Sequence, residues 1–146
     1  MIPAPLVGAW SLVSVTAKAT DGEDRQPFGD KPIGQLIYAA SGHMALVLTR
    51  TGRPKFASGD SLAGTPDEIR AAFEGLEAYA GTCEADLDDG SILHHALVCR
   101  FPNWEGGTQF RFFTLTGDTL VLSTPPMTAA GKEWVLSSTW RREPAR

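Results

Sequence analysis

The stretch that decides the fold is TCEADLDDGSILHHALVCRF, residues 82–101. Two strand-like runs, 82–87 and 92–101, flank the dipeptide Asp89-Gly90. Asp-Gly between two such runs is typical of a tight β-hairpin, because glycine readily adopts the positive φ that the turn requires. The sequence therefore predicts two antiparallel strands joined by a short turn.

The register of this hairpin predicts which side chains meet. With Asp89 and Gly90 at the centre of the turn, Glu84 lies directly opposite His95, within reach of a carboxylate–imidazole hydrogen bond. We interpret this pair as a candidate general acid/base pair, and the alternative is a charge pair on an outer wall. A three-residue turn would shift the register by one and separate the two side chains. Because neighbours in a strand point to opposite faces, His94 and His95 cannot both enter one cavity without a bulge.

The same register applies to the two cysteines. Cys83 lies opposite Ala96, and Cys99 then faces the other side of the sheet, so a disulfide between them is disfavoured. Neither cysteine has the spacing of a zinc ligand, and we predict no metal site. Two free thiols fit a reducing compartment, and we expect a cytoplasmic protein.

Glycine-containing turns punctuate the rest of the chain. Strand-like runs at 36–39 and 44–49 flank Ser41-Gly42, runs at 110–115 and 120–123 flank Gly117-Asp118, and runs at 10–17 and 134–142 stand near the two ends. About eight strands joined largely by hairpins predict an antiparallel all-β domain.

A two-residue turn at Ser41-Gly42 gives that hairpin two apolar faces. One face carries Ile37, Met44, Leu46 and Leu48, and the other carries Leu36, Tyr38, Ala45 and Val47. A barrel wall is ordinarily polar outside. We therefore expect one face to line a cavity and the other to be covered by a helix or by a second subunit, which makes a homodimer possible.

One segment has helical signals. Thr65 is a helix N-cap, Pro66 suits the first helical position, and Glu68 completes a capping box. Apolar residues follow at helical spacing: Ile69, Ala72, Phe73, Leu76 and Ala80. These signals predict one short helix over about residues 66–79 that plugs or covers the barrel.

Composition excludes several classes of partner. The chain has 146 residues, 42% hydrophobic, with a formal net charge of −4. This length fits one domain, residues 1–146. The chain has no basic stripe for nucleic acid, no apolar run of membrane-spanning length and no signal-peptide pattern at its start. Common dinucleotide and phosphate-loop motifs are absent, so we predict no cofactor.

An ordered set of motifs resembles the bacterial and fungal lipocalin-like domain family, a calycin-type small β-barrel. The motifs run from about Leu6 to Arg142: Gly8-Ala9-Trp10, Gly34–Tyr38, Ser41–Met44, His94-His95, Phe101–Trp104, Leu120–Pro126 and Trp140–Arg142. The resemblance implies an antiparallel up-and-down barrel of about 8–10 strands with an internal cavity. In that family a tryptophan like Trp10 fills the closed end and an arginine from the last strand packs across its ring. The resemblance implies no general activity.

Two further polar or aromatic residues stand out. The Gly117-Asp118 turn places Arg111 on one face with Phe113 and Leu122. Inside a barrel Arg111 would hold a carboxylate or enolate, and outside it would be a solvated wall residue. Trp104 lies in a glycine-rich turn, where it either forms a lid or interface or packs back on the rim.

Three functions remain open from the sequence. The first is the binding of a small hydrophobic or ring-containing molecule, with Tyr38, Met44, His94, Trp104 and Arg111 as candidate ligand-binding residues. The second is a cofactor-independent cyclase, isomerase or dehydratase, in which Glu84 and His95 move a proton and Arg111 stabilises an oxyanion. The third is a dimeric stress or scaffold protein that acts through an apolar outer face.

Overall fold

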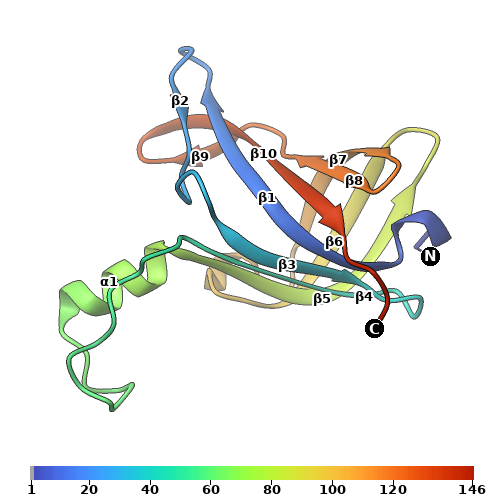
Figure 1. The fold of residues 1–146 in the computed structure, drawn as a ribbon. Helices are drawn as coiled ribbons and strands as arrows, with labels where there is room; N and C mark the ends of the chain where they lie inside the picture. Colours follow the sequence, from blue (N-terminus) through green and yellow to red (C-terminus); the bar gives the residue numbers. More distant parts are fainter. Residues whose placement is uncertain (1) are drawn as a thin grey trace.

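The computed structural model describes residues 2–146, whose strands form one antiparallel sheet that closes into a barrel (Figure 1). The strands are β1 (Gly8–Ala19), β2 (Asp24–Arg25), β3 (Ile33–Tyr38), β4 (His43–Thr49), β5 (Leu76–Asp86), β6 (Ser91–Cys99), β7 (Thr108–Thr116), β8 (Thr119–Ser123), β9 (Met127–Ala129) and β10 (Lys132–Arg142). They lie in the order β2-β1-β3-β4-β5-β6-β7-β8-β10-β9, and β1 also pairs with β10. Without the short strands β2 and β9, eight strands form the closed wall, which confirms the predicted lipocalin-like all-β barrel.

The short helix η1 (Ala4–Leu6) lies at one end of the barrel, next to the N-terminus (Figure 1). Trp10 lies in the core and contacts this helix. Its indole has no exposed surface, and its Nε1 donates to the carbonyl of Leu6 at 3.0 Å. The guanidinium of Arg142 lies 4.2 Å from the centre of the indole ring and donates to the carbonyl of Val7 at 3.0 Å. This arrangement joins the first and last strands and closes that end of the barrel.

The helix α1 (Pro66–Glu74) begins as predicted and ends earlier. Thr65 Oγ1 accepts from the amide of Glu68 at 3.2 Å, and a carboxylate oxygen of Glu68 accepts from the amide of Thr65 at 2.8 Å. The predicted end at residue 79 is wrong, because Leu76 already pairs with Thr49 and begins β5. The apolar residues 76–80 therefore belong to a strand, where pairing with β4 overrides their helical spacing.

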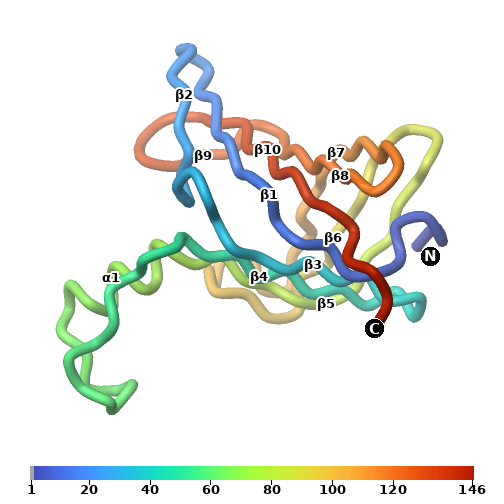
Figure 2. The backbone as a smooth tube through the Cα atoms, in the orientation of Figure 1, coloured from blue at the N-terminus to red at the C-terminus, as the bar shows by residue number. Residues whose placement is uncertain are grey.

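The position of α1 also differs from the expectation. The helix projects beyond the end of the barrel opposite the N-terminal helix η1 (Figures 1 and 2), and none of its residues is buried. Ile69 and Phe73 keep 52% and 44% of their surface exposed. The helix neither plugs the barrel nor covers its wall, and Phe73 instead packs against the guanidinium of Arg100, 4.2 Å from its ring centre.

The register of the β3–β4 hairpin is one residue away from the prediction. Ala39 donates to the carbonyl of His43 at 2.9 Å, and Gly42 has a φ of +84°, so the loop has three residues, Ala40–Gly42. Gly42 takes the left-handed place that ends such a loop. Tyr38 consequently pairs with Met44, and the inward face becomes Leu36, Tyr38, Met44, Leu46 and Leu48, all buried. Ile37 and Val47 face outward, 40% and 46% exposed.

The β5–β6 hairpin also has a longer turn than predicted. Asp86 pairs with Ser91, which leaves the four residues 87–90 in the loop. Cys83 therefore lies opposite His94, not Ala96, and Glu84 lies opposite Leu93, not His95. Because the register moved by two residues, every side chain keeps the face that the prediction assigned to it within residues 82–95.

A β-bulge at Leu97 corrects the predicted position of Cys99. Gly81 pairs with Ala96 and Ala80 with Val98, so Leu97 is an extra residue in β6. The bulge reverses the alternation, and Cys99 turns into the core with only 8% of its surface exposed. Both cysteines are therefore buried on the inner side of the barrel, and they form no disulfide.

Candidate functional site

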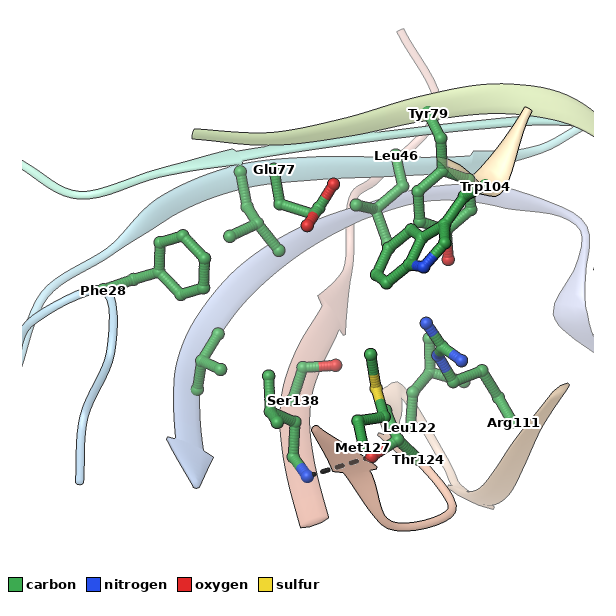
Figure 3. A pocket seen from close by; sticks show the side chains of 13 residues that line it. Phe28, Leu46, Glu77, Tyr79, Trp104, Arg111, Leu122, Thr124, Met127 and Ser138 are labelled. Carbon is green, nitrogen blue, oxygen red and sulfur yellow. Dashed lines mark hydrogen bonds between the residues drawn. The ribbon is translucent and has the colours of Figure 1, made fainter. Parts of the chain in front are cut away.

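An internal cavity of about 90 Å³ lies in the barrel (Figure 3). Its apolar lining comes from Val15, Phe28, Leu46, Leu48, Leu122, Met127 and Leu136, and its polar lining includes Glu77, Tyr79, Trp104, Arg111, Thr124 and Ser138. A single water needs ~10–15 Å³ in comparable terms, so the cavity is larger than a hydration site. It is the candidate binding site.

Behind the cavity wall, His94 bridges two tyrosines. Its Nε2 lies 2.8 Å from the phenol oxygen of Tyr38, and its Nδ1 lies 2.7 Å from the phenol oxygen of Tyr79. The three residues come from β6, β3 and β5, and all three side chains are buried. Both ring nitrogens of the imidazole are therefore satisfied by phenols.

Burial sets the protonation of this group. Loss of hydration lowers the pKa of His94 to about 3, with the nearby Arg111 cation acting in the same direction. Burial raises the pKa of Tyr79 to about 12, although Arg111 opposes this rise, and it raises the pKa of Tyr38 well above its usual value. At neutral pH the imidazole is uncharged and both phenols keep their protons.

Arg111 faces inward from β7. The prediction left its face open, and the structure places it inside with 9% of its surface exposed. The predicted register at Gly117-Asp118 is correct, since Leu115 pairs with Leu120 and Phe113 with Leu122. Its guanidinium donates to the carbonyl of Phe110 at 2.7 Å and forms no ion pair within residues 2–146. A buried cation without a counter-charge is unusual, because desolvating a charge is costly.

Trp104 lines the cavity instead of forming an outer lid. It ends the short helix η2 (Pro102–Trp104), and its ring lies edge-on to Tyr79 with 6.3 Å between centres. The loop is held at the bulge in β6, where Gly106 donates to the carbonyl of Ala96 and Ala96 donates to that of Gly107. The bulge and this loop together bring an aromatic ring from the end of β6 into the barrel.

The comparisons with known proteins agree with this architecture. Residues 7–143 match the lipocalin-like domain family. The chain belongs to this family. It is also 31% identical over 108 residues to the 4'-hydroxy-3'-methoxypropiophenone carrier protein ppsC of Aspergillus oryzae, an alignment that covers 69% of this chain and 97% of the relative. The lipocalin-like barrel and a relative named as a carrier support small-molecule binding.

Three of the five predicted ligand-binding residues do not line the cavity of this lipocalin-like domain. Met44 is buried in the core beside its cross-strand partner Tyr38, with 4% of its surface exposed. Tyr38 and His94 are likewise absent from the cavity lining and reach it only through Tyr79. Trp104 and Arg111 are the two predicted residues that contact the cavity directly.

Glu84 and His95 lie on the outer wall. His95 Nε2 is 2.8 Å from a carboxylate oxygen of Glu84, and its Nδ1 is 2.9 Å from the hydroxyl of Thr108. The two residues are diagonal neighbours across β5 and β6, and the side chains of His95 and Glu84 are 38% and 56% exposed, respectively. The hydrogen bond from His95 lowers the pKa of Glu84. The two residues face away from the cavity, and their role in proton transfer stays a prediction.

Tyr79 is one of several cavity-lining residues that were not predicted from the sequence; the others include Phe28, Glu77, Thr124, Met127 and Ser138. The helix predicted to residue 79 included Tyr79, so its inward direction was not considered. Tyr79 and Cys83 are both buried at an even spacing along β5, an alternation that a strand interpretation of residues 76–86 would have used.

The lipocalin-like chain contains no cluster of three or more His, Cys, Asp or Glu side chains that could hold a metal ion, as far as residues 2–146 are concerned. Over the same residues, no helix is long and apolar enough to cross a membrane.

Proposed function

We propose that this lipocalin-like domain binds a small, ring-containing hydrophobic molecule in the barrel cavity. The observation that carries the proposal is the lining of the cavity. Aliphatic side chains, Phe28 and Trp104 line it together with a few polar groups, which is the usual composition of a small-molecule site.

The related carrier protein indicates the kind of ring. Its name specifies 4'-hydroxy-3'-methoxypropiophenone, a phenol that carries a ketone. A flat aromatic ring with oxygen substituents matches a cavity that combines apolar walls with hydrogen-bond donors. We therefore propose hydroxylated aryl ketones as the first compounds to test.

Binding is favoured over the catalytic alternative by the position of the polar residues. The proton-transfer hypothesis depends on Glu84 and His95, which point to the outside of the barrel. A substrate in the cavity would not reach them. A cytoplasmic location remains a prediction.

A homodimer likewise remains a prediction. Ile37, Val47 and Val98 are exposed on the outer wall, 40%, 46% and 56% respectively. Size-exclusion chromatography with light scattering would measure the oligomeric state, and a monomer at all concentrations would contradict the dimer.

The test is a calorimetric titration of the purified chain with 4'-hydroxy-3'-methoxypropiophenone, alongside native mass spectrometry of freshly purified protein. The variant Leu48→Phe narrows the cavity, because Leu48 lines it from β4. The matched control Val47→Phe changes the neighbouring residue, which faces outward. We expect Leu48→Phe to lose binding and Val47→Phe to keep it. Equal binding by both variants would show that the ligand lies elsewhere.

A further inference from the structure

Three hydrogen-bond donors converge at one side of the cavity: the phenol of Tyr79, the indole N–H of Trp104 and the guanidinium of Arg111 (Figure 3). We call these three residues the donor corner. Trp104 Nε1 has no hydrogen-bond partner within residues 2–146. Arg111 donates to the carbonyl of its neighbour Phe110, and it also interacts with the phenol oxygen of Tyr79, which opposes the rise in the pKa of that phenol. None of these three groups carries a negative charge, so the donor corner leaves a place for an anionic acceptor atom.

The carboxylate at this cavity is already paired. Glu77 lines the cavity from β5, but one of its oxygens lies 3.1 Å from Arg100 and the other accepts from the amide of Ala78 at 3.1 Å. The titratable groups that face the donor corner are therefore Glu77, its partner Arg100, the two members Tyr79 and Arg111, and His94 behind them. The negative charge of Glu77 balances the positive charge of Arg100, and no group in this set balances the positive charge of Arg111.

The bridge from Tyr38 through His94 decides where the proton of Tyr79 points. A neutral imidazole has one N–H donor and one nitrogen that accepts. If Tyr38 donates to Nε2, the proton of His94 lies on Nδ1 and is donated to the oxygen of Tyr79. The hydroxyl proton of Tyr79 is then not used in the bond to His94. The neighbouring guanidinium of Arg111 has only donors, so it cannot accept this proton. The hydroxyl of Tyr79 is thus directed to the cavity.

Hydrogen bonds that run in the opposite direction, from Tyr79 through His94 to Tyr38, would leave a buried donor without a partner. If Tyr79 donated to Nδ1, Nε2 would donate to Tyr38, whose own proton would need another acceptor. Tyr38 is 1% exposed, does not line the cavity and has no further hydrogen bond within residues 2–146. A buried donor without a partner loses its hydration without compensation. The bridge therefore runs from Tyr38 to His94 to Tyr79 and ends in the cavity.

We propose that the donor corner binds a single oxyanion of the ligand, the phenolate, enolate or carboxylate oxygen of an otherwise apolar molecule. The inference rests on the proposed binding function and adds the charge of the ligand. The oxyanion accepts from Tyr79, Trp104 and Arg111, and it supplies the counter-charge that Arg111 lacks. The apolar body extends away from the donor corner toward Phe28, which lies at the opposite side of the cavity (Figure 3).

Two matched pairs of probes test this inference on the intact chain. The first pair is 4'-hydroxy-3'-methoxypropiophenone and its methyl ether 3',4'-dimethoxypropiophenone, which cannot ionise. The second pair is 3-phenylpropanoate and 3-phenylpropan-1-ol. At a pH where the first phenol is partly ionised, we expect the anionic member of at least one pair to bind about tenfold to a hundredfold more tightly than the neutral one. If the phenol is the preferred ligand, the phenolate absorption band appears on binding and the pKa of the bound phenol falls by about one pH unit or more.

Variants distinguish residues that contact the oxyanion directly from Tyr38, which acts only by positioning the proton of Tyr79. Arg111→Met and Tyr79→Phe remove members of the donor corner, and we expect the preference for the anion to be lost or greatly reduced. Tyr38→Phe removes no cavity atom, but it allows Nδ1 of His94 to accept the proton of Tyr79. We expect it to lower affinity for the anion several-fold while the neutral partner binds as before. Arg141→Met on the exposed side of β10 is the matched control and should keep the preference.

The outcomes are distinguishable. Equal affinity for both members of both pairs, with no phenolate band, would overturn the oxyanion inference and leave the binding function intact. Failure of all four probes to bind would overturn the proposed function together with the inference. Retention of the anion preference by a folded Arg111→Met variant would exclude the donor corner as the anion site.

Discussion

Nδ1 of His94 lies 2.7 Å from the phenol oxygen of Tyr79, and the imidazole has no exposed surface. With Nε2 bonded to Tyr38, both ring nitrogens have protein partners. The ring is held neutral, because a proton added to it would be a second positive charge near Arg111 in a site without solvent. Because the folded protein excludes a proton from His94, its free energy of unfolding should depend on pH.

Stability should fall as the pH is lowered from about 7 to 5. The pKa of His94 is about 3 in the folded chain and 6.5 in an ordinary environment. Below pH 6.5 the unfolded chain therefore binds a proton that the folded chain excludes, and the free energy of unfolding falls by about 1 kcal/mol per pH unit toward pH 3. Urea denaturation at several pH values measures this slope.

The control for this prediction is His94→Gln, which cannot ionise. Carboxylates with lowered pKa, such as Glu68, lose most of their stabilising effect below their ordinary pKa of 4.5, so they contribute little between pH 5 and 7. The variant should be less stable than the parent at pH 7 and should have a shallower slope. A slope unchanged by His94→Gln would assign the pH dependence to other groups.

Arg111→Met should stabilise the unliganded protein by about 1–3 kcal/mol. Arg111 is a buried cation without an ion pair, and methionine has a similar length and suits the apolar lining. Urea denaturation compares it with Arg141→Met, an exposed change that should lie within about 0.5 kcal/mol of the parent. A strongly destabilised Arg111→Met would mean that the guanidinium is structurally required, and the donor corner would lose its main argument.

Gly81→Ala should destabilise the barrel by about 3 kcal/mol or more, or prevent folding. A Cβ at Gly81 would lie 1.9 Å from the carbonyl oxygen of His95, because the bulge at Leu97 brings the two backbones together. Thermal unfolding followed by circular dichroism measures the loss. Gly59→Ala, where a Cβ meets nothing within 4 Å, is the control and should unfold near the temperature of the parent.

Glu84→Gln should leave ligand affinity unchanged. Its carboxylate contacts His95 on the outer wall and is 56% exposed, so the change does not reach the cavity. Calorimetry with 4'-hydroxy-3'-methoxypropiophenone compares this variant with Leu48→Phe, for which binding should be lost. If Glu84→Gln removed binding or a measured turnover, the outer pair would belong to the functional site and the catalytic interpretation would regain support.

The length of each turn decided whether the register of its hairpin was predicted correctly from the sequence. The two-residue turn at Gly117-Asp118 is as predicted, and with it the face that Arg111 shares with Leu122. Ser41-Gly42 belongs to a three-residue loop, and Asp89-Gly90 ends a four-residue loop. A glycine that ends a longer loop looks the same in sequence as one inside a two-residue turn, so register is less certain than the presence of a hairpin.

The contact between Glu84 and His95 illustrates this limit. The hydrogen bond exists, but the two residues are diagonal neighbours, because the register differs from the predicted one by two residues. Cys99 shows the larger error, since an unforeseen bulge at Leu97 reversed its face. A bulge depends on how two strands and the following loop pack, which no local motif specifies.

Local sequence was sufficient for most of the strands, their antiparallel pairing and the start of the helix after Thr65, but not for the first residues of β5, which were predicted as helix. Glycine φ preferences, β-branched runs and the capping box act over a few residues, so they are readable without the fold. The tertiary structure alone decided which face is the interior, where the helix ends and which groups meet in the core. Tyr38 and His94 are 56 residues apart, and Arg111 becomes a buried cation only after β1 pairs with β10 to close the wall. Such contacts depend on closure of the whole barrel, and the chemistry of the cavity depends on them.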